Sequence, residues 1–417
     1  MENSMIKKIL VQITSLFKKH PIYELKEVFT PTSSADISYI SRSSVEKKLK
    51  KALDIPGKQI VIYGHSGSGK TTILNHIIKE QNLKAITSRC TNNSTIDTII
   101  LDAFDSLNPY YTESTNISCK ESLTSSIASE YLGIKSSISS TSENSIGEIQ
   151  KRILPPQLTI QRLCNFIGSA KALWIIEDFH KIPEIEKSKI SQMMKLFMDK
   201  ATDYPDSKII VLGAADNGYE VVQHDTELNN RISEIEVPLL TTQEIVQIIE
   251  KGATALNIDI SNETATEIAK YANCLATVAH QLAYNLCFNN NISKTQRKLV
   301  TIPNSELTQA VADFTSEKQD TYKNLYMKIT QQREGKYQNV SIILSALCKM
   351  DDNVTQHALL TKIQESTPSY PPGNLSTYLK QLYSPEREEV LRNNAGRISF
   401  SEPFFKSYIR MLNAQQS

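Results

Sequence analysis

The segment that most constrains this chain spans residues 64–71, Gly-His-Ser-Gly-Ser-Gly-Lys-Thr, which fit the Walker A pattern G-x-x-x-x-G-K-[ST]. Glycines let successive backbone N–H groups turn inward around phosphate oxygens, and the N-terminus of a following helix adds a favourable dipole. The preceding segment Gln59–Tyr63 is nearly all apolar, as expected of a strand covered on both faces of a parallel sheet. The pattern therefore predicts an α/β P-loop fold.

Residues 64–71, called the P-loop below, predict ATP and Mg²⁺ as cofactors. The Lys70 ammonium would reach the β- and γ-phosphates, and the Thr71 hydroxyl would bind Mg²⁺. The alternative is a glycine-rich turn that binds nothing. The residues expected to contact the nucleotide are Gly64, His65, Ser66, Gly67, Ser68, Gly69, Lys70, Thr71 and Thr72.

A second apolar segment, residues 173–176, ends in the acids Glu177 and Asp178. The carboxyl edge of a parallel sheet would bring both beside the P-loop. One is expected to bind Mg²⁺ through water and the other to activate the attacking water. The usual order is Asp then Glu, and here it is reversed. By position Glu177 is the metal-side residue and Asp178 the base, although a one-residue slip would exchange them. Two surface acids at a strand end are the alternative.

Strands and helices alternate from about residue 36 to residue 238, which predicts a parallel sheet and an ATP-binding core over this range. A helix is predicted at Thr95–Leu107, ending at Asn108-Pro109. Residues 110–147, rich in Ser, Thr and Asn, are interpreted as an insertion. Residues 1–35 form a predicted N-terminal extension. Three further strands are expected, at Lys84–Cys90, Ala172–Ile176 and Lys208–Leu212.

Beyond Thr241 we expect helices and no strands until the C-terminal part. Residues 239–305 are predicted to form a helical lid, and 306–417 a helical linker and a winged helix. The winged helix is inferred from three short helices followed by two extended runs, which the turn Asn-Asn-Ala-Gly at 393–396 separates. Its basic residues, such as Lys380, Arg392 and Arg397, are interspersed with acids. DNA binding and protein docking both remain open.

Several single residues are candidates for a role around the nucleotide. Arg231 precedes a short last strand, where an arginine finger would stabilise charge on the transferring phosphoryl group of a neighbouring molecule. A plain surface arginine is the alternative. Asp216 or Asn217, which follow the predicted strand Lys208–Leu212, could sense the γ-phosphate. His280 and Gln281 occupy a lid position suited to sensing, although a packed histidine is favoured.

Bulk composition describes an ordinary globular protein of two or three domains. The chain has 417 residues, 40% hydrophobic, with a formal net charge of +1. No overall attraction to nucleic acid follows from that charge. Six scattered cysteines without a C-x-x-C pair, and the lack of a long apolar run, favour a cytoplasmic protein with no membrane span. Residues 5–17 are predicted to form an amphipathic helix and not a signal peptide.

The order of these motifs resembles that of the origin-recognition-type AAA+ and STAND ATPases. Residues 39–42, Tyr-Ile-Ser-Arg, look like the F-[IV]-G-R box that opens those proteins, with Ser41 replacing the glycine. The P-loop, the acidic pair, Arg231, a lid and a winged helix follow, so the resemblance covers about residues 36–417. It implies an ATPase, and Arg42 would lie by the adenine pocket. The inverted acids and a lid helix without the arginine that many AAA+ proteins carry there depart from the group.

Three functional hypotheses follow. The preferred one is an AAA+/STAND-like ATPase whose nucleotide state drives opening, self-association or partner binding, for example in antiviral genome defence. The second is an initiator or transposition-type ATPase that holds duplex DNA through the winged helix. The third is a nucleotide-gated switch that binds ATP or ADP tightly and seldom turns over.

Overall fold

The structure is a computed structural model that describes residues 21–116, 129–130, 132, 159–213, 230–331 and 337–416. The predicted helix at 5–17, the sensor candidates Asp216 and Asn217, and most of the insertion at 110–147 lie outside these residues. The chain divides into two units, residues 40–240 and residues 1–39 with 241–417. Among the described residues, no helix has the length and apolar character needed to cross a membrane.

The unit of residues 40–240 contains one five-stranded sheet in which every pairing is parallel. The strand order is β2-β3-β4-β1-β5. The central strands are apolar and almost wholly buried, as strands with helices on both faces must be. The predicted parallel sheet is thereby confirmed. The strands are β1 (Gln59–Tyr63), β2 (Lys84–Arg89), β3 (Ala172–Glu177), β4 (Lys208–Gly213) and β5 (Ile232–Glu236).

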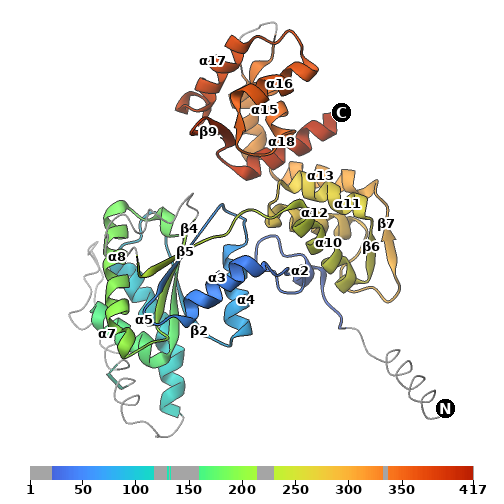
Figure 1. Cartoon of the computed structure of the whole chain (residues 1–417). Helices are drawn as coiled ribbons and strands as arrows, with labels where there is room; N and C mark the ends of the chain where they lie inside the picture. Colours follow the sequence, from blue (N-terminus) through green and yellow to red (C-terminus); the bar gives the residue numbers. More distant parts are fainter. Residues whose placement is uncertain are drawn as a thin grey trace, which may run out of the picture. The chain divides into compact units, whose positions relative to one another are not determined.

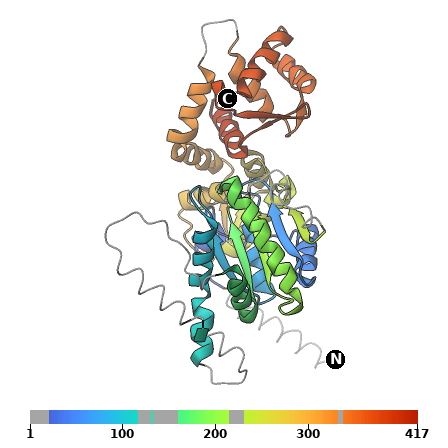
Figure 2. The ribbon, with the colours of Figure 1, turned by 90° about the vertical axis from the view of Figure 1, so that its left-hand side faces the viewer.

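Helices cover the two faces of this sheet. Helices α5 (Ile96–Asn116), α7 (Ile160–Ala170) and α8 (Glu184–Asp199) lie on one side, and α3 (Ser43–Asp54) and α4 (Lys70–Glu80) lie on the other (Figure 1). Figure 2 looks onto the side that carries α5, α7 and α8. The prediction that the first of these ends at Asn108-Pro109 is wrong, because α5 continues to Asn116. A proline removes only one hydrogen bond of the helix ladder and can bend a helix without ending it.

The hydrophobic core of the sheet is centred on Trp174 in β3. This side chain is fully buried, and its Nε1 donates to the Ser88 hydroxyl of β2 at 3.1 Å. Phe197 of α8 packs on its ring at a centroid distance of 6.1 Å. Neighbouring strands are therefore joined through side chains as well as through the backbone ladder.

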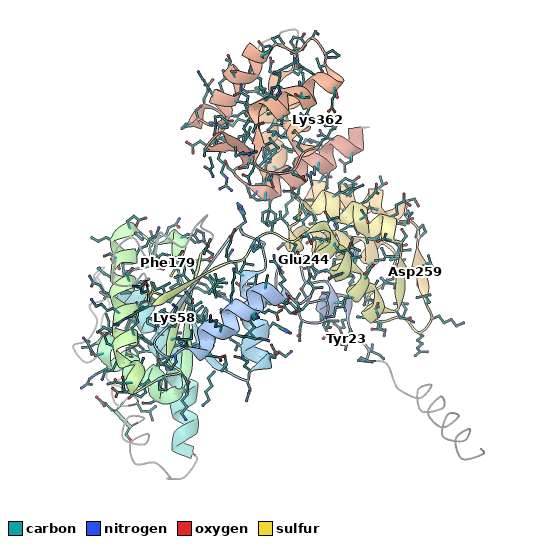
Figure 3. All side chains as sticks on the ribbon, in the orientation of Figure 1. Tyr23, Lys58, Phe179, Glu244, Asp259 and Lys362 are labelled. Carbon is teal, nitrogen blue, oxygen red and sulfur yellow. The ribbon has the colours of Figure 1, made fainter. Side chains whose placement is uncertain are left out.

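In the second unit, residues 241–302 lie within the range 239–305 predicted to be a helical lid, and they are called the lid below. Helix α10 (Thr242–Leu256) begins with a capping box, in which the Thr241 hydroxyl accepts from Glu244 N and the Glu244 carboxylate accepts from Thr241 N. Glu244 is labelled in Figure 3. Helices α11 (Asn262–Ala272) and α12 (Ala276–Asn289) follow. The expectation of no strands here is wrong, because β6 (Ile258–Ile260) and β7 (Val300–Ile302) pair in parallel. Three-residue strands are too short to show an alternating pattern.

The first described residues also belong to this second unit. The backbone of Tyr23 pairs with that of Thr295, Leu25 N donates to Ser293 O, and the short helix α2 (Leu25–Val28) follows. Phe29 is fully buried against α10, where a Cβ on Gly252 would lie 2.4 Å from its Cζ. Figure 3 labels Tyr23 at the start of this segment. Part of the predicted N-terminal extension thus packs on the lid.

Helix α13 (Glu306–Glu317), a π-helical turn (Gln319–Lys323) and α14 (Asn324–Thr330) lead to the C-terminal module. This module has the element order of a winged helix, with a three-stranded antiparallel sheet of order β8-β10-β9. The predicted turn has positive φ at Ala395 and Gly396. Figure 2 shows the strands beside the helices of the module. Its elements are α15 (Asn339–Cys348), β8 (Val354–Thr355), α16 (Gln356–Ser366), α17 (Pro372–Leu382), β9 (Leu391–Asn394), β10 (Arg397–Phe400) and α18 (Pro403–Gln416).

Candidate nucleotide-binding site

The P-loop connects the carboxyl end of β1 to the N-terminus of α4. Three of its residues have positive φ, namely Gly64 at 139°, Gly67 at 77° and Gly69 at 91°. At Gly64 the requirement for glycine is also steric, because a Cβ there would lie 2.3 Å from Val237 O. The loop therefore has the curled backbone that the sequence pattern predicts.

Lys70 lies on the first turn of α4, and its side chain folds back over the loop. The Nζ atom donates to Gly64 O at 2.8 Å and to His65 O at 2.7 Å. Burial lowers the pKa of this ammonium to about 8, while the negative charge of Asp178 opposes that shift. A half-buried cation whose ammonium donates to carbonyl oxygens gains strongly from an anionic ligand.

Thr71 and Glu177, which the sequence analysis assigned to the metal, lie side by side. The Thr71 hydroxyl lies 3.4 Å from Glu177 Oε1, although the two residues are 106 positions apart in sequence. A hydroxyl and a carboxylate side by side are the oxygen ligands that Mg²⁺ takes in proteins, directly or through water. The donor set therefore fits the metal expected from the sequence, with Thr71 and Glu177 as the residues that would hold it.

Arg89, at the end of β2, also contacts this carboxylate. Its Nε donates to Glu177 Oε2 at 3.2 Å, because β2 and β3 pair in a register that sets Arg89 opposite Glu177. The sequence analysis did not assign Arg89 a role. The predicted strand Lys84–Cys90 put Arg89 near a strand end, but only the strand order places that end next to the acidic pair.

Asp178 follows Glu177 in a different backbone conformation. Its φ is 59°, in the left-handed region, so the extended backbone of β3 ends at this residue. Asp178 Oδ2 accepts from Lys181 Nζ at 2.8 Å. Phe179, labelled in Figure 3, follows at the same end of the sheet. The two acids thus have distinct partners, as expected if one is on the metal side and the other acts as a base.

The remaining residues expected to contact the nucleotide differ in exposure. Ser68 is buried, and its hydroxyl has no hydrogen-bond partner among the described residues. His65 and Thr72 are half-buried and Ser66 is exposed. A buried hydroxyl without a partner carries a cost of desolvation, which a bound phosphate oxygen would offset. This orphaned atom fits a loop shaped for an anion.

Arg42 is a largely buried residue that contacts the P-loop. Its guanidinium donates to Ser68 O at 3.3 Å, to Pro238 O at 2.9 Å and to Leu239 O at 3.3 Å. The residue is 9% exposed. Direct contact with the adenine, as expected from the sequence, remains a prediction, since these donors are used on backbone carbonyls.

Arg231 lies at the edge of the sheet opposite the P-loop. Gln59, at the amino end of β1, pairs with Ile232, and Gln59 N donates to Arg231 O at 3.0 Å. The five residues of β1 separate this end from the P-loop, a span of about 16 Å. The Arg231 side chain is 58% exposed and pairs with Asp199 at 3.4 Å. It could act on a nucleotide only in another copy of the chain.

His280 is a packed residue of the lid. It is 3% exposed, its Nδ1 accepts from Thr30 N at 3.0 Å, and its ring meets Phe29 edge-on. Burial lowers its pKa to about 4. Gln281 donates to Asn285 on the same helix. These contacts support the packed interpretation of His280 over a nucleotide-sensing one.

No family model and no curated protein matches this sequence. Solved structures do resemble it. The Walker-type ATPase paby2304 of Pyrococcus abyssi has a TM-score of 0.52 at 12% identity, over 89% of this chain and 96% of that chain. The ORC2 protein of Aeropyrum pernix, in ADPNP and ADP complexes, has a TM-score of 0.49 at 12% identity, over 95% and 100%. Cdc6p of Pyrobaculum aerophilum has a TM-score of 0.44 at 14% identity, over 95% and 99%.

The likeness to the Pyrococcus protein, together with the parallel sheet and the P-loop, establishes the fold. The core of the chain has an α/β P-loop fold, and a helical lid and a C-terminal module with winged-helix element order follow it. The fold class predicted from the sequence is thereby confirmed.

Proposed function

We propose that this protein binds ATP with Mg²⁺ and hydrolyses it to drive a conformational change. The observation that carries the proposal is the convergence of the Lys70 ammonium, the Thr71 hydroxyl and the Glu177 carboxylate at one edge of the sheet. A curled loop with a helix N-terminus binds phosphate, and the acids supply the oxygen ligands for a metal.

Each residue has a separate task in this proposal. Lys70 exchanges its two carbonyl partners for the phosphate oxygens and stabilises their charge. Thr71 and Glu177 hold Mg²⁺, which would neutralise charge on the phosphates when bound. Asp178 accepts a proton from the attacking water, and Lys181 orients its carboxylate. Although the order of the two acids is inverted, each task still has a carboxylate. The base, Asp178, is one methylene shorter than the usual Glu, so its carboxylate reaches less far from the backbone.

The test of this proposal compares Lys70→Ala with Lys79→Ala, an exposed lysine of the same helix. Lys70→Ala is expected to abolish ATP binding in a titration with a fluorescent ATP analogue, and Lys79→Ala to leave it unchanged. Equal binding by both variants would refute the site.

A protein that binds ATP but seldom hydrolyses it is distinguished from an ATPase by single-turnover γ-phosphate release, measured for the wild type and for Asp178→Ala. If both release phosphate equally slowly, the protein binds ATP but is not an ATPase.

The arginine at the opposite edge of the sheet supports nucleotide-dependent self-association as a finer part of the proposal. Arg231 cannot reach its own P-loop, so a role in hydrolysis requires a head-to-tail neighbour that shares its nucleotide. Particle size by light scattering should then grow with ATP and Mg²⁺, and Arg231→Ala should lose turnover. Lys200→Ala, which removes a nearby exposed cation paired with Asp203, is the matched control. Unchanged assembly and turnover in Arg231→Ala would remove the finger.

We propose protein docking, and not DNA reading, as the task of the winged-helix module. Its basic side chains largely serve the module itself, since Arg392 donates to the Ser399 hydroxyl and Arg397 to Asn353 O. Lys406 is 1% exposed and pairs with Asp352. Helix α17, third in the module, carries only Lys380 as a cation. Salt-sensitive duplex binding that is lost in the triple variant of Lys380, Arg392 and Arg397 would favour the DNA-binding alternative instead. Identifying the protein that docks on this module would test the proposed role in genome defence.

A further inference from the structure

The chain crosses between the two units at two places, Tyr39–Ile40 and Leu240–Thr241. Both crossings are close to the Arg42 side chain, the first along the sequence and the second through hydrogen bonds. Arg42 comes just after the first crossing, and its guanidinium donates to Pro238 O and Leu239 O just before the second. The same guanidinium donates to Ser68 O in the P-loop. One buried side chain therefore joins both connecting segments to the loop expected to hold the phosphates.

Further contacts fix these segments to the P-loop on the core side. Val237 N donates to Tyr63 O at 2.9 Å, directly before the loop. Gly64, the first loop residue, approaches Val237 so closely that no Cβ would fit. The Arg42 backbone N–H donates to the Glu46 carboxylate of α3 at 3.0 Å, which holds the first segment in place. A shift of the loop cannot leave residues 237–239 unmoved, because packed contacts transmit displacement.

The other unit holds the same two segments on its own side of the crossings. Tyr39 O accepts from Lys251 Nζ of α10 at 2.5 Å, and the capping box at Thr241 begins α10 itself. One helix thus receives both connections. The chain between these anchors and the Arg42 contacts is short, consisting of Ile40 and Ser41 on one segment and Leu240 on the other. Short connections transmit a change in direction, whereas long ones would absorb it.

We infer that Arg42 is a positioning residue that couples the state of the P-loop to both connections leading to the lid and winged helix. This inference rests on the proposed binding of ATP at the same loop. A guanidinium is planar and offers several donors in a fixed fork, so it can hold carbonyls from two segments and the loop in one geometry. When the loop closes on phosphate, a change at Ser68 O is passed through this fork to residues 238–239.

The experiment measures communication separately from binding. Spin labels are introduced at Gln192 on α8 and Glu267 on α11, both exposed, through unnatural amino acids so that the native cysteines stay in place. The distance distribution between the labels is recorded in the full chain without nucleotide and with ATP and Mg²⁺. The variants are Arg42→Met, which keeps the bulk but removes the fork, and Arg42→Lys, which restores a single point charge. ATP affinity is measured on each labelled protein.

The wild-type distribution is expected to shift on ATP binding. At an ATP concentration that saturates each protein, Arg42→Met should lose the shift, and Arg42→Lys should recover part of it. An unchanged shift in Arg42→Met would overturn the inference. Loss of ATP binding in Arg42→Met would overturn it too, since Arg42 would then act on the nucleotide or the loop itself. If the wild type binds ATP without any shift, the coupling fails while the proposed binding site stands. If the wild type binds no ATP, the proposed function fails first.

Discussion

Arg89 and Glu177 face each other at the ends of β2 and β3, with Arg89 Nε 3.2 Å from Glu177 Oε2. The pair is asymmetric in exposure, because the Arg89 side chain is 80% exposed and that of Glu177 is 17% exposed. The other carboxylate oxygen of Glu177 lies by the Thr71 hydroxyl. Arg89 thus neutralises a carboxylate that we propose binds Mg²⁺, and competes with the metal for it.

Replacing Arg89 by Met should therefore strengthen Mg²⁺ binding in the presence of ATP. An exposed ion pair is worth up to about 1 kcal/mol, which corresponds to a few-fold lower half-saturating Mg²⁺ concentration for ATP turnover. Lys84→Met, at the exposed other end of the same strand, is the control and should have no effect. A weaker response to Mg²⁺ in Arg89→Met would mean that Arg89 helps to assemble the site and does not compete.

Lys70 predicts a pH dependence of ATP binding. Burial lowers its pKa to about 8 in the nucleotide-free protein, and bound phosphate would restore the ammonium. ATP affinity should therefore fall as the pH rises above that value, with proton uptake on binding of up to one proton. Isothermal titration calorimetry in buffers of different ionisation heat measures the uptake, one pH unit below and above the pKa. Lys70→Arg, whose guanidinium stays charged, should show none; equal uptake in that variant would assign the proton to another group.

His280 predicts acid sensitivity of the unit that contains the lid. Its pKa is lowered to about 4 by burial, below the value of about 6.5 expected in the unfolded chain. The unfolded state therefore binds the proton more readily, and stability present above pH 6.5 is lost as the pH falls toward 4. The loss amounts to about 3 kcal/mol.

The matched variant is His280→Asn, which keeps an acceptor for Thr30 N but does not titrate. Urea unfolding followed by far-ultraviolet circular dichroism at neutral and acidic pH gives the free energy of unfolding. The wild type should lose more stability than the variant, and the difference isolates His280 from the carboxylates common to both. Parallel losses would show that His280 is not the titrating group.

Two glycines in helices should respond to alanine in opposite directions. Alanine at Gly252 of α10 would gain helix propensity of about 1 kcal/mol. Its Cβ would however lie 2.4 Å from Phe29 Cζ, and Phe29 is fully buried, so we expect a net loss of about 1–3 kcal/mol. At Gly373 of α17 a Cβ meets no atom within 4 Å, so alanine should stabilise. Thermal unfolding of both variants tests this, and equal midpoints would show that Phe29 can move aside.

The strands and helices of the core could be predicted because the sequence pattern within each segment determines its secondary structure. The apolar segment before the P-loop is β1 at the residues expected, and the capping box that begins α10 lies within four consecutive residues. The strand at residues 172–176 likewise could be predicted from its unbroken apolar run, which buried strands of parallel sheets share. Glu177 lies within 3.4 Å of the Thr71 hydroxyl, and its metal-side role stays a prediction.

The remaining features depend on contacts between distant residues. The role of Arg89 requires β2 to lie beside β3, and no local pattern encodes the strand order. The packing of Tyr23 and Phe29 on the lid joins segments more than 200 positions apart. The contacts of Arg42 require Pro238, Leu239 and the P-loop to meet, and no local sequence pattern encodes that meeting.

The place of Trp174 has a practical consequence. It is the only tryptophan of the chain, and it lies fully buried at the centre of the sheet in the unit of residues 40–240. Its intrinsic fluorescence is consequently a native reporter for that unit alone, while the lid and winged helix contribute no indole emission. Exciting this single chromophore during unfolding separates the melting of the ATP-binding core from that of the remainder, without any label or truncation.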